Sequence, residues 1–275
     1  MSWMGLPVPR DRSDRHGICR LCGFEGKLSF EHVPPRAAFN RNPLVLTGIN
    51  ELRGRDLDDV RGRTQQKGAG AYTLCERCNN HTGHWYGEAY VEWARQALMI
   101  IRATEGWATL YYSYRISPLR VLKQIVCMFL SANSRGFAEA HPDLLKFVLD
   151  PERHGMDPRL QIFAFLNGSN RGRQAGLSAL GQLGPGRITL LSEVTFPPFG
   201  FVMCVGSPAP DPRLVDITFF ARYRYRDASD LFIALPVLPV YSPYPGDYRA
   251  RETVLDTARR AQATVAANGH KPPGR

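Results

Sequence analysis

The chain has 275 residues, of which 44% are hydrophobic and 22% are charged, a composition typical of a globular protein. It has no run of about 18 apolar residues, which excludes a membrane-spanning helix, and its N-terminus lacks the apolar stretch of a secretory signal, so we expect a cytoplasmic location. With 35 basic and 25 acidic side chains the net charge is +10, which favours a polyanionic partner such as nucleic acid.

Composition divides the chain into four segments. Residues 1–17 are polar and proline-containing, so we predict a flexible lead-in. Residues 18–103 contain a cysteine-rich unit, and residues 104–268 form a second, α+β domain without a recognisable catalytic motif. Residues 269–275 are predicted to be a flexible tail.

The cysteine-rich unit begins with a predicted strand at residues 27–33, where polar and apolar side chains alternate and two prolines follow. Residues 36–72 show little periodicity, and a connection of this length is either functional or an insertion without a role of its own. Apolar residues then recur with helical spacing, which predicts a helix over residues 79–103.

The second half begins with a predicted helix over residues 118–133, which is apolar on most sides and should be central. The pattern then changes to short apolar runs, and two prolines join two of them in a hairpin. The predicted strands are 160–166, 188–196, 199–205, 214–225 and 232–240, and a final helix covers 248–267. The sequence therefore predicts an α+β fold with a mainly antiparallel sheet.

Six cysteines are present, and four of them form the C-x-x-C pairs Cys19/Cys22 and Cys75/Cys78. Two such pairs separated by a long loop are typical of a tetrahedral structural zinc site, although the same four thiolates can also hold an iron–sulfur cluster. The other two cysteines lie in apolar sequence and are expected in the core: Cys127 and Cys204.

A Glu31-His32 dipeptide followed by proline lies between the two pairs, and Asn79 directly follows the last cysteine. Together, these motifs resemble the zinc-bearing branch of the HNH endonuclease family over about residues 18–90. The resemblance implies a ββα-metal fold, in which a short hairpin is followed by a helix. It also implies metal-dependent hydrolysis of phosphodiester bonds.

The resemblance assigns a role to each matching residue. His32 takes the position of the general base, while Glu31 and Asn79 take those of the ligands to a catalytic divalent ion. The residue types suit this chemistry, because imidazole accepts a proton from water and hard oxygen ligands bind Mg²⁺ or Mn²⁺. The sequence departs from the family pattern in two places: a middle Asn has no counterpart before Cys75, and Glu31 replaces the commoner Asp.

Four further residues near this unit have two interpretations each. His81 and His84 share a helix face, where they can join the metal shell or contact phosphate, or are simply surface histidines. Lys67 and Arg77 are candidate phosphate contacts, although exposed basic residues are common.

Two arginine groups in the second half are candidate nucleic-acid contacts. If 214–225 continues as a strand, one of its faces carries a row of arginines and the other carries tyrosines. Such a row can follow a phosphate backbone, or it can be the solvated face of a sheet. The glycine-rich loop at 167–176 is either a second contact or a flexible linker. The arginines concerned are Arg222, Arg224, Arg226, Arg171 and Arg173.

The leading hypothesis is a metal-dependent HNH-type endonuclease that uses structural Zn²⁺ and catalytic Mg²⁺ or Mn²⁺ and acts on DNA rather than RNA. The family resemblance implies a 5′-phosphate and a 3′-hydroxyl as products. One alternative is a non-catalytic zinc-knuckle module that binds nucleic acid or a protein partner. Another is a zinc unit that only stabilises the fold while the activity resides in residues 104–275.

Overall fold

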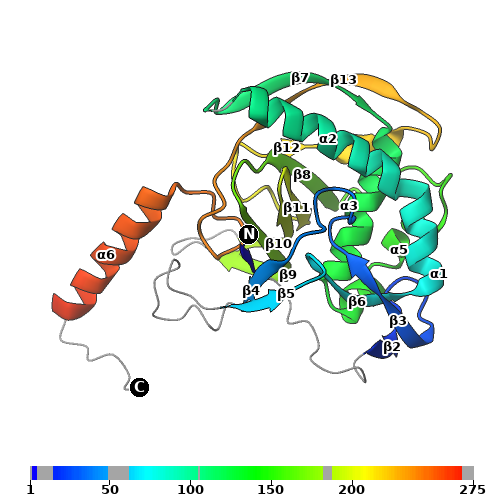
Figure 1. The fold of residues 1–275 in the computed structure, drawn as a ribbon, viewed down its shortest axis with the longest axis horizontal. Coiled ribbons are helices and arrows are strands. Elements are labelled where there is room, and N and C mark those ends of the chain that lie inside the picture. Colours follow the sequence, from blue (N-terminus) through cyan, green and yellow to red (C-terminus); the bar gives the residue numbers. More distant parts are fainter. Residues whose placement is uncertain (1, 5–14, 49–61, 105, 182–187, 268–275) are drawn as a thin grey trace.

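The computed structural model describes residues 2–4, 15–48, 62–104, 106–181 and 188–267 (Figure 1). It is a mixed α/β molecule with mainly antiparallel sheets, which confirms the predicted class. None of the helices in this part of the chain has the length and apolar character needed to cross a membrane. The predicted tail, residues 269–275, lies outside the described residues.

The largest sheet in these residues has eight strands in the order β12-β8-β11-β10-β9-β1-β4-β5. The strands β8, β10 and β11 agree with prediction, and β10 and β11 form the predicted hairpin. In the order of the sheet, the strands are β12 (Val215–Asp216), β8 (Leu160–Leu166), β11 (Phe199–Val205), β10 (Ile188–Phe196), β9 (Arg171–Gly181), β1 (Ser2–Met4), β4 (Leu44–Thr47) and β5 (Arg63–Gln65).

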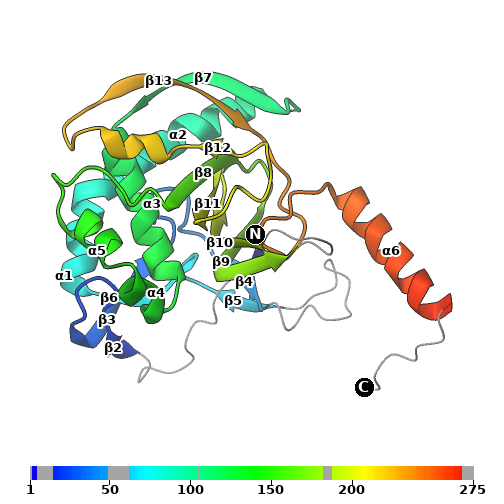
Figure 2. The same ribbon diagram turned by 180° about the vertical axis from the view of Figure 1, so that it is seen from behind.

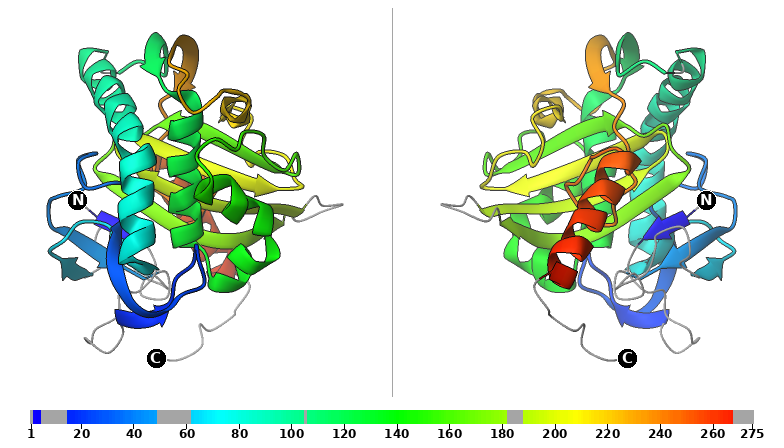
Figure 3. Two further views of the ribbon diagram at one scale, coloured as in Figure 1. Left: turned by 90° about the vertical axis from the view of Figure 1, so that its right-hand side faces the viewer. Right: turned by 90° about the vertical axis from the view of Figure 1, so that its left-hand side faces the viewer.

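The three predicted helices are present, and two shorter helices, α4 and α5, lie beside α3 (Figure 2). The predicted helix at 79–103 is a continuous helical run that contains one turn of π-helix, η3. The helix α6 extends away from the rest of the molecule (Figures 1 and 3). The bounds are α1 (Glu76–Thr82), η3 (Gly83–Gly87), α2 (Glu88–Ala103), α3 (Pro118–Ala132), α4 (Arg135–Ala140), α5 (Pro142–Leu149) and α6 (Arg251–Ala267).

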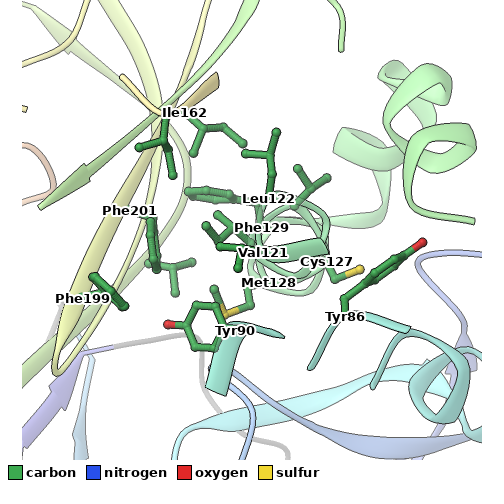
Figure 4. Packing of buried hydrophobic residues seen from close by; sticks show 14 of the residues in the cluster. Tyr86, Tyr90, Val121, Leu122, Cys127, Met128, Phe129, Ile162, Phe199 and Phe201 are labelled. Atoms are coloured by element: carbon green, nitrogen blue, oxygen red, sulfur yellow. The ribbon is translucent and has the colours of Figure 1, made fainter. Parts of the chain in front are cut away.

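Helix α3 is the centre of the molecule, as its sequence predicts. All of its residues except Arg120 are buried. Figure 4 shows Phe129 and Met128 of α3 between Phe201 of the sheet and Tyr90 of α2. The buried cluster around α3 extends from the cysteine-rich unit to the large sheet. Cys127 and Cys204 are fully buried, which confirms their predicted place in the core.

Two parts of the second half differ from the prediction. Instead of a strand over 214–225, the chain forms the two-residue β12 and then a 3-10 helix, η4 (Thr218–Arg222). The predicted strand at 232–240 is β13 (Ser229–Pro236), which pairs antiparallel with the unpredicted β7 (Thr109–Ile116). The β7–β13 ribbon lies against α2 (Figure 1).

The cysteine-rich unit contains a three-stranded sheet of β2 (His16–Ile18), β3 (Glu25–His32) and β6 (Gly70–Cys75). The segment between β3 and β6 supplies β4 and β5 to the large sheet. There β4 pairs with β1, a strand inside the predicted lead-in that also pairs with β9. The division at residue 103 stays a prediction, and the buried cluster is shared by both segments.

Candidate active site

Four thiols meet where the ends of β2, β6 and α1 converge. Their sulfur atoms all lie within 4.8 Å of one another, and the Cys22 and Cys75 Sγ atoms are 3.7 Å apart. A tetrahedral shell with Zn–S distances of about 2.3 Å has sulfur–sulfur edges of about 3.8 Å. The cluster of Cys19, Cys22, Cys75 and Cys78 can therefore hold a structural metal such as zinc.

Local backbone structure forms each half of this cluster. Between β2 and β3, the amide of Cys19 donates to the Phe24 carbonyl at 2.8 Å and the amide of Gly23 donates to Cys19 at 3.0 Å, so the chain forms a tight knuckle. Cys75 ends β6, and Cys78 lies in the first turn of α1. The hydrogen bond with Cys78 lowers the pKa of the Cys19 thiol, the direction that favours a metal-binding thiolate.

The Glu31-His32 dipeptide lies at the end of β3, opposite Ala71 and Gly70 of β6. The strands approach closely here, because a Cβ atom at Gly70 would lie 2.1 Å from the Glu31 carbonyl oxygen. Helix α1 begins immediately after β6. The strand–strand–helix arrangement expected from the resemblance is therefore present in β3, β6 and α1.

Asn79 joins α1 to the strand that carries the dipeptide. Its Nδ2 donates to Ser29 Oγ at 3.0 Å and to the Phe30 carbonyl at 3.2 Å, and Ser29 in turn donates to the Leu74 carbonyl at 3.0 Å. Among the described residues, Oδ1 of Asn79 has no hydrogen bond. The amide is thus held by its nitrogen, while its oxygen is available as a ligand.

Glu31 is only 5% exposed, and burial raises the pKa of its carboxyl to about 8. Within the described part of the chain, no side-chain hydrogen bond reaches this carboxyl. The charge of Glu31 also contributes to the raised pKa of the Cys127 thiol in α3, after burial. A buried acid without a partner is unfavourable when charged, and a bound cation would reverse that preference.

His32 is half-buried and packs edge-on against Phe30, with 4.9 Å between the ring centroids. Burial lowers its pKa, and the positive charges of Arg36 and Lys67 lower it further, while a hydrogen bond to the Lys67 backbone acts in the opposite direction. A lowered pKa keeps the imidazole neutral at neutral pH, as a general base requires.

Successive side chains of a strand point to opposite faces. His32 shares its face with Phe30, whereas Glu31, the residue between them, lies on the opposite face. The structure thus brings Asn79 onto the strand of Glu31 and His32, but the two neighbouring side chains leave that strand in different directions. Binding of one ion by Glu31 and Asn79 together stays a prediction.

The sequence interpretation missed Ser29, whose hydroxyl orients Asn79. The only signal for Ser29 in the sequence is a polar residue inside a strand of alternating character.

The accessory candidates lie on the surface around this centre. His81, His84 and Arg77 are exposed on α1 and η3. His81 lies against Trp85, with 5.1 Å between ring centroids. Lys67 is exposed, and its Nζ lies 5.7 Å from the centre of the Phe30 ring.

The glycine-rich segment that was predicted as a loop is mostly strand β9, and Arg173 is buried in it. Arg173 is 1% exposed and bonds Glu193, which is itself fully buried, at 2.7 and 2.9 Å. The prediction that Arg173 contacts nucleic acid is therefore wrong, because phosphate cannot reach it. Arg171 is half-buried, and its guanidinium lies 4.8 Å from the centre of the Tyr241 ring.

The second arginine row does not lie on a strand. Arg222 ends η4, and Arg224 and Asp227 close a turn in which the Arg224 amide donates to the Asp227 carboxylate at 2.7 Å. Nevertheless the predicted alternation is present, since Arg222, Arg224 and Arg226 are exposed. The two tyrosines between them are half-buried.

Comparisons with protein families, with curated proteins and with solved structures give no match to this chain. The resemblance to HNH endonucleases therefore rests on the residues described above.

Proposed function

We propose that the chain is a metal-dependent endonuclease of the HNH type, with zinc at the four cysteines and a catalytic divalent ion beside Glu31 and Asn79. The observation that carries the proposal is the attachment of Asn79 to the Glu31-His32 strand, with its amide oxygen left available. The net charge of +10 supports a nucleic-acid substrate.

Each residue has a defined task in this proposal. His32, neutral because its pKa is lowered, takes a proton from the attacking water. Glu31 and Asn79 supply oxygen ligands to Mg²⁺ or Mn²⁺, and the bound ion neutralises charge on the phosphate. Ser29 keeps the Asn79 amide in place through its hydroxyl. The thiolates hold the ends of β2, β6 and α1 together and take no part in the reaction.

A nicking assay on supercoiled plasmid and on single-stranded DNA and RNA, with added Mg²⁺ or Mn²⁺, tests the proposal. His32→Ala should lower the cleavage rate by about 10²- to 10⁴-fold, the range typical of a general base. Asn79→Ala should abolish cleavage, because it removes a proposed ligand of the catalytic ion. Both variants should retain zinc. His16→Ala is the matched control, since His16 is exposed in the adjacent strand β2. Undiminished cleavage by His32→Ala would reject this mechanism.

The second candidate function is a non-catalytic zinc-knuckle module that binds nucleic acid or a protein partner. It is favoured by the burial of Glu31 and by the opposite directions of Glu31 and His32. This alternative predicts that the wild-type protein cleaves none of the substrates while it binds one of them in a salt-dependent manner.

A further inference from the structure

A basic surface segment lies beside the helix that carries Asn79. Arg222, Arg224 and Arg226 are exposed, and none of the three guanidinium groups forms an ion pair with any residue that the structure describes. The nearest carboxylate in sequence, that of Asp227, accepts a hydrogen bond from the backbone amide of Arg224 at 2.7 Å. The backbone amide of Asp227 donates in turn to the Arg224 carbonyl at 3.1 Å. The resulting closed turn fixes the segment and presents its arginines to solvent.

Tyr225 attaches this segment to the π-helix η3. Its hydroxyl donates to the Trp85 carbonyl at 3.3 Å. Arg120 Nε donates to the same carbonyl at 2.8 Å, and the Arg120 guanidinium lies 5.5 Å from the centre of the Tyr225 ring. π-Helical turns are rare in proteins, and those that occur are often found at functional sites. Here the Trp85 carbonyl of η3 accepts hydrogen bonds from Tyr225 of the arginine segment and from Arg120 of α3.

The turn η3 directly follows α1, the helix that carries Asn79. The rings of Trp85 and His81 are 5.1 Å apart, and His81 lies on α1, as does Asn79. At about 1.5 Å per residue, Asn79 and Trp85 are separated by about 9 Å along the helix axis. Half-buried aromatic rings and arginines thus form a path beside η3, the turn that follows α1.

We infer that this path binds the substrate of the proposed enzyme as single-stranded nucleic acid, an inference that rests on the proposed function. Arginines neutralise the backbone, and aromatic rings stack on bases. A duplex keeps its base faces paired and stacked, so rings of this kind are useful only to unpaired nucleotides. We name the path Trp85, Arg120, Arg222, Arg224, Tyr225 and Arg226.

Fluorescence anisotropy with labelled poly(dT), poly(U) and a DNA duplex tests the inference, using the zinc-loaded full chain without added Mg²⁺ or Mn²⁺. Arg224→Ala/Arg226→Ala should weaken poly(dT) binding at least 10-fold and reduce the slope of log K against log salt by about 1.4, or 0.7 for each lost phosphate contact. Trp85→Ala should weaken binding by about 5- to 100-fold and leave that slope unchanged.

The matched control is Arg259→Ala/Arg260→Ala on α6, which removes the same charge from exposed positions on a separate element. It should leave binding unchanged. An equal loss in this control, or tighter binding of the duplex than of either single strand, would overturn the inference. The poly(U) arm decides whether DNA or RNA is preferred. If the path variants lose binding but the wild type cleaves nothing, the path binds nucleic acid and the proposed function is rejected. If the wild type cleaves and the path variants bind normally, the proposed function stands and the inference is rejected.

Discussion

At the scale of single residues, Arg173 shows how a surface-like sequence can encode a buried ion pair. Its guanidinium bonds Glu193 and also donates to the Ser242 carbonyl at 2.6 Å. Glu193 is fully buried and accepts a further bond from the Thr195 hydroxyl at 2.7 Å. Because both charges are desolvated, each depends on the other.

We therefore expect Arg173→Ala to lower the free energy of unfolding by about 3–5 kcal/mol, the cost of leaving one buried charge without its partner. Urea denaturation measures this change. The double variant Arg173→Met/Glu193→Met should be more stable than Arg173→Ala. Arg159→Ala is the control, since Arg159 is exposed and pairs with Asp157, and its loss should have a much smaller effect. A small effect of Arg173→Ala would contradict the structural role.

The residues of the candidate site were predictable to different degrees. Each cysteine pair is visible in sequence because a metal ligand shell imposes short, regular spacing. The position of Asn79 against Ser29 was not predictable, because it depends on how α1 packs on β3. The burial of Glu31 also escapes sequence analysis, since it depends on how distant parts of the chain pack around β3.

At the scale of elements, apolar runs with proline or glycine at their ends located β8, β10 and β11 correctly. Strand β9 was missed because its basic, glycine-containing sequence is typical of a linker, and it is a strand because it pairs with β10 and β1. The wrong strand at 214–225 has a similar cause. Arginines and tyrosines alternate there because the segment packs against η3, and not because it joins a sheet.

The cysteine-rich unit leads to a prediction at this scale. Removing the proposed zinc, by a chelator or by Cys22→Ser, should increase amide hydrogen exchange in β3, β6 and α1, because a metal at the four thiols would link these elements. Exchange in β10 and β11 should change less. Hydrogen-exchange mass spectrometry and zinc analysis provide the measurements.

Cys204→Ala serves as the control for loss of a thiol, since Cys204 lies in the core outside the four-thiol cluster. It should keep its zinc and the slow exchange of β3. If the metal-free protein exchanges in β3 as slowly as the zinc-bound form, the four thiols do not stabilise the unit.

At the scale of the whole molecule, stability depends on α3, which also contains a buried lysine. Lys123 donates to the Asp150 and Pro151 carbonyls at 2.5 and 3.0 Å, and its Nζ lies 4.7 Å from the centre of the Phe147 ring. Burial lowers its pKa from 10.5 to about 8. The folded protein therefore releases this proton at a lower pH than the unfolded chain does.

Between pH of about 8 and 10.5, the unfolded chain keeps the Lys123 proton and the folded protein does not. The free energy of unfolding should thus rise with pH in this window through Lys123, by up to about 1.4 kcal/mol per pH unit. Below pH of about 8, where both states are protonated, the contribution is constant. Urea denaturation across this window should show a smaller rise for Lys123→Met than for the wild type.

Lys146→Met provides the comparison, since Lys146 is an exposed lysine that pairs with Asp143. It should show the same dependence on pH as the wild type. Equal slopes for Lys123→Met and the wild type would mean that Lys123 titrates alike in both states.

The chain between the two cysteine pairs leaves the metal-binding unit, adds β4 and β5 to the edge of the large sheet, and returns to Cys75. The cysteine-rich unit and the large sheet are consequently joined by two crossings of the backbone, one before β4 and one after β5. A graft of residues 18–103 into another protein would transplant two strands without the β1 and β9 neighbours that continue their sheet. Exchange of such a unit between proteins, by recombination or by design, requires the sheet to move with it.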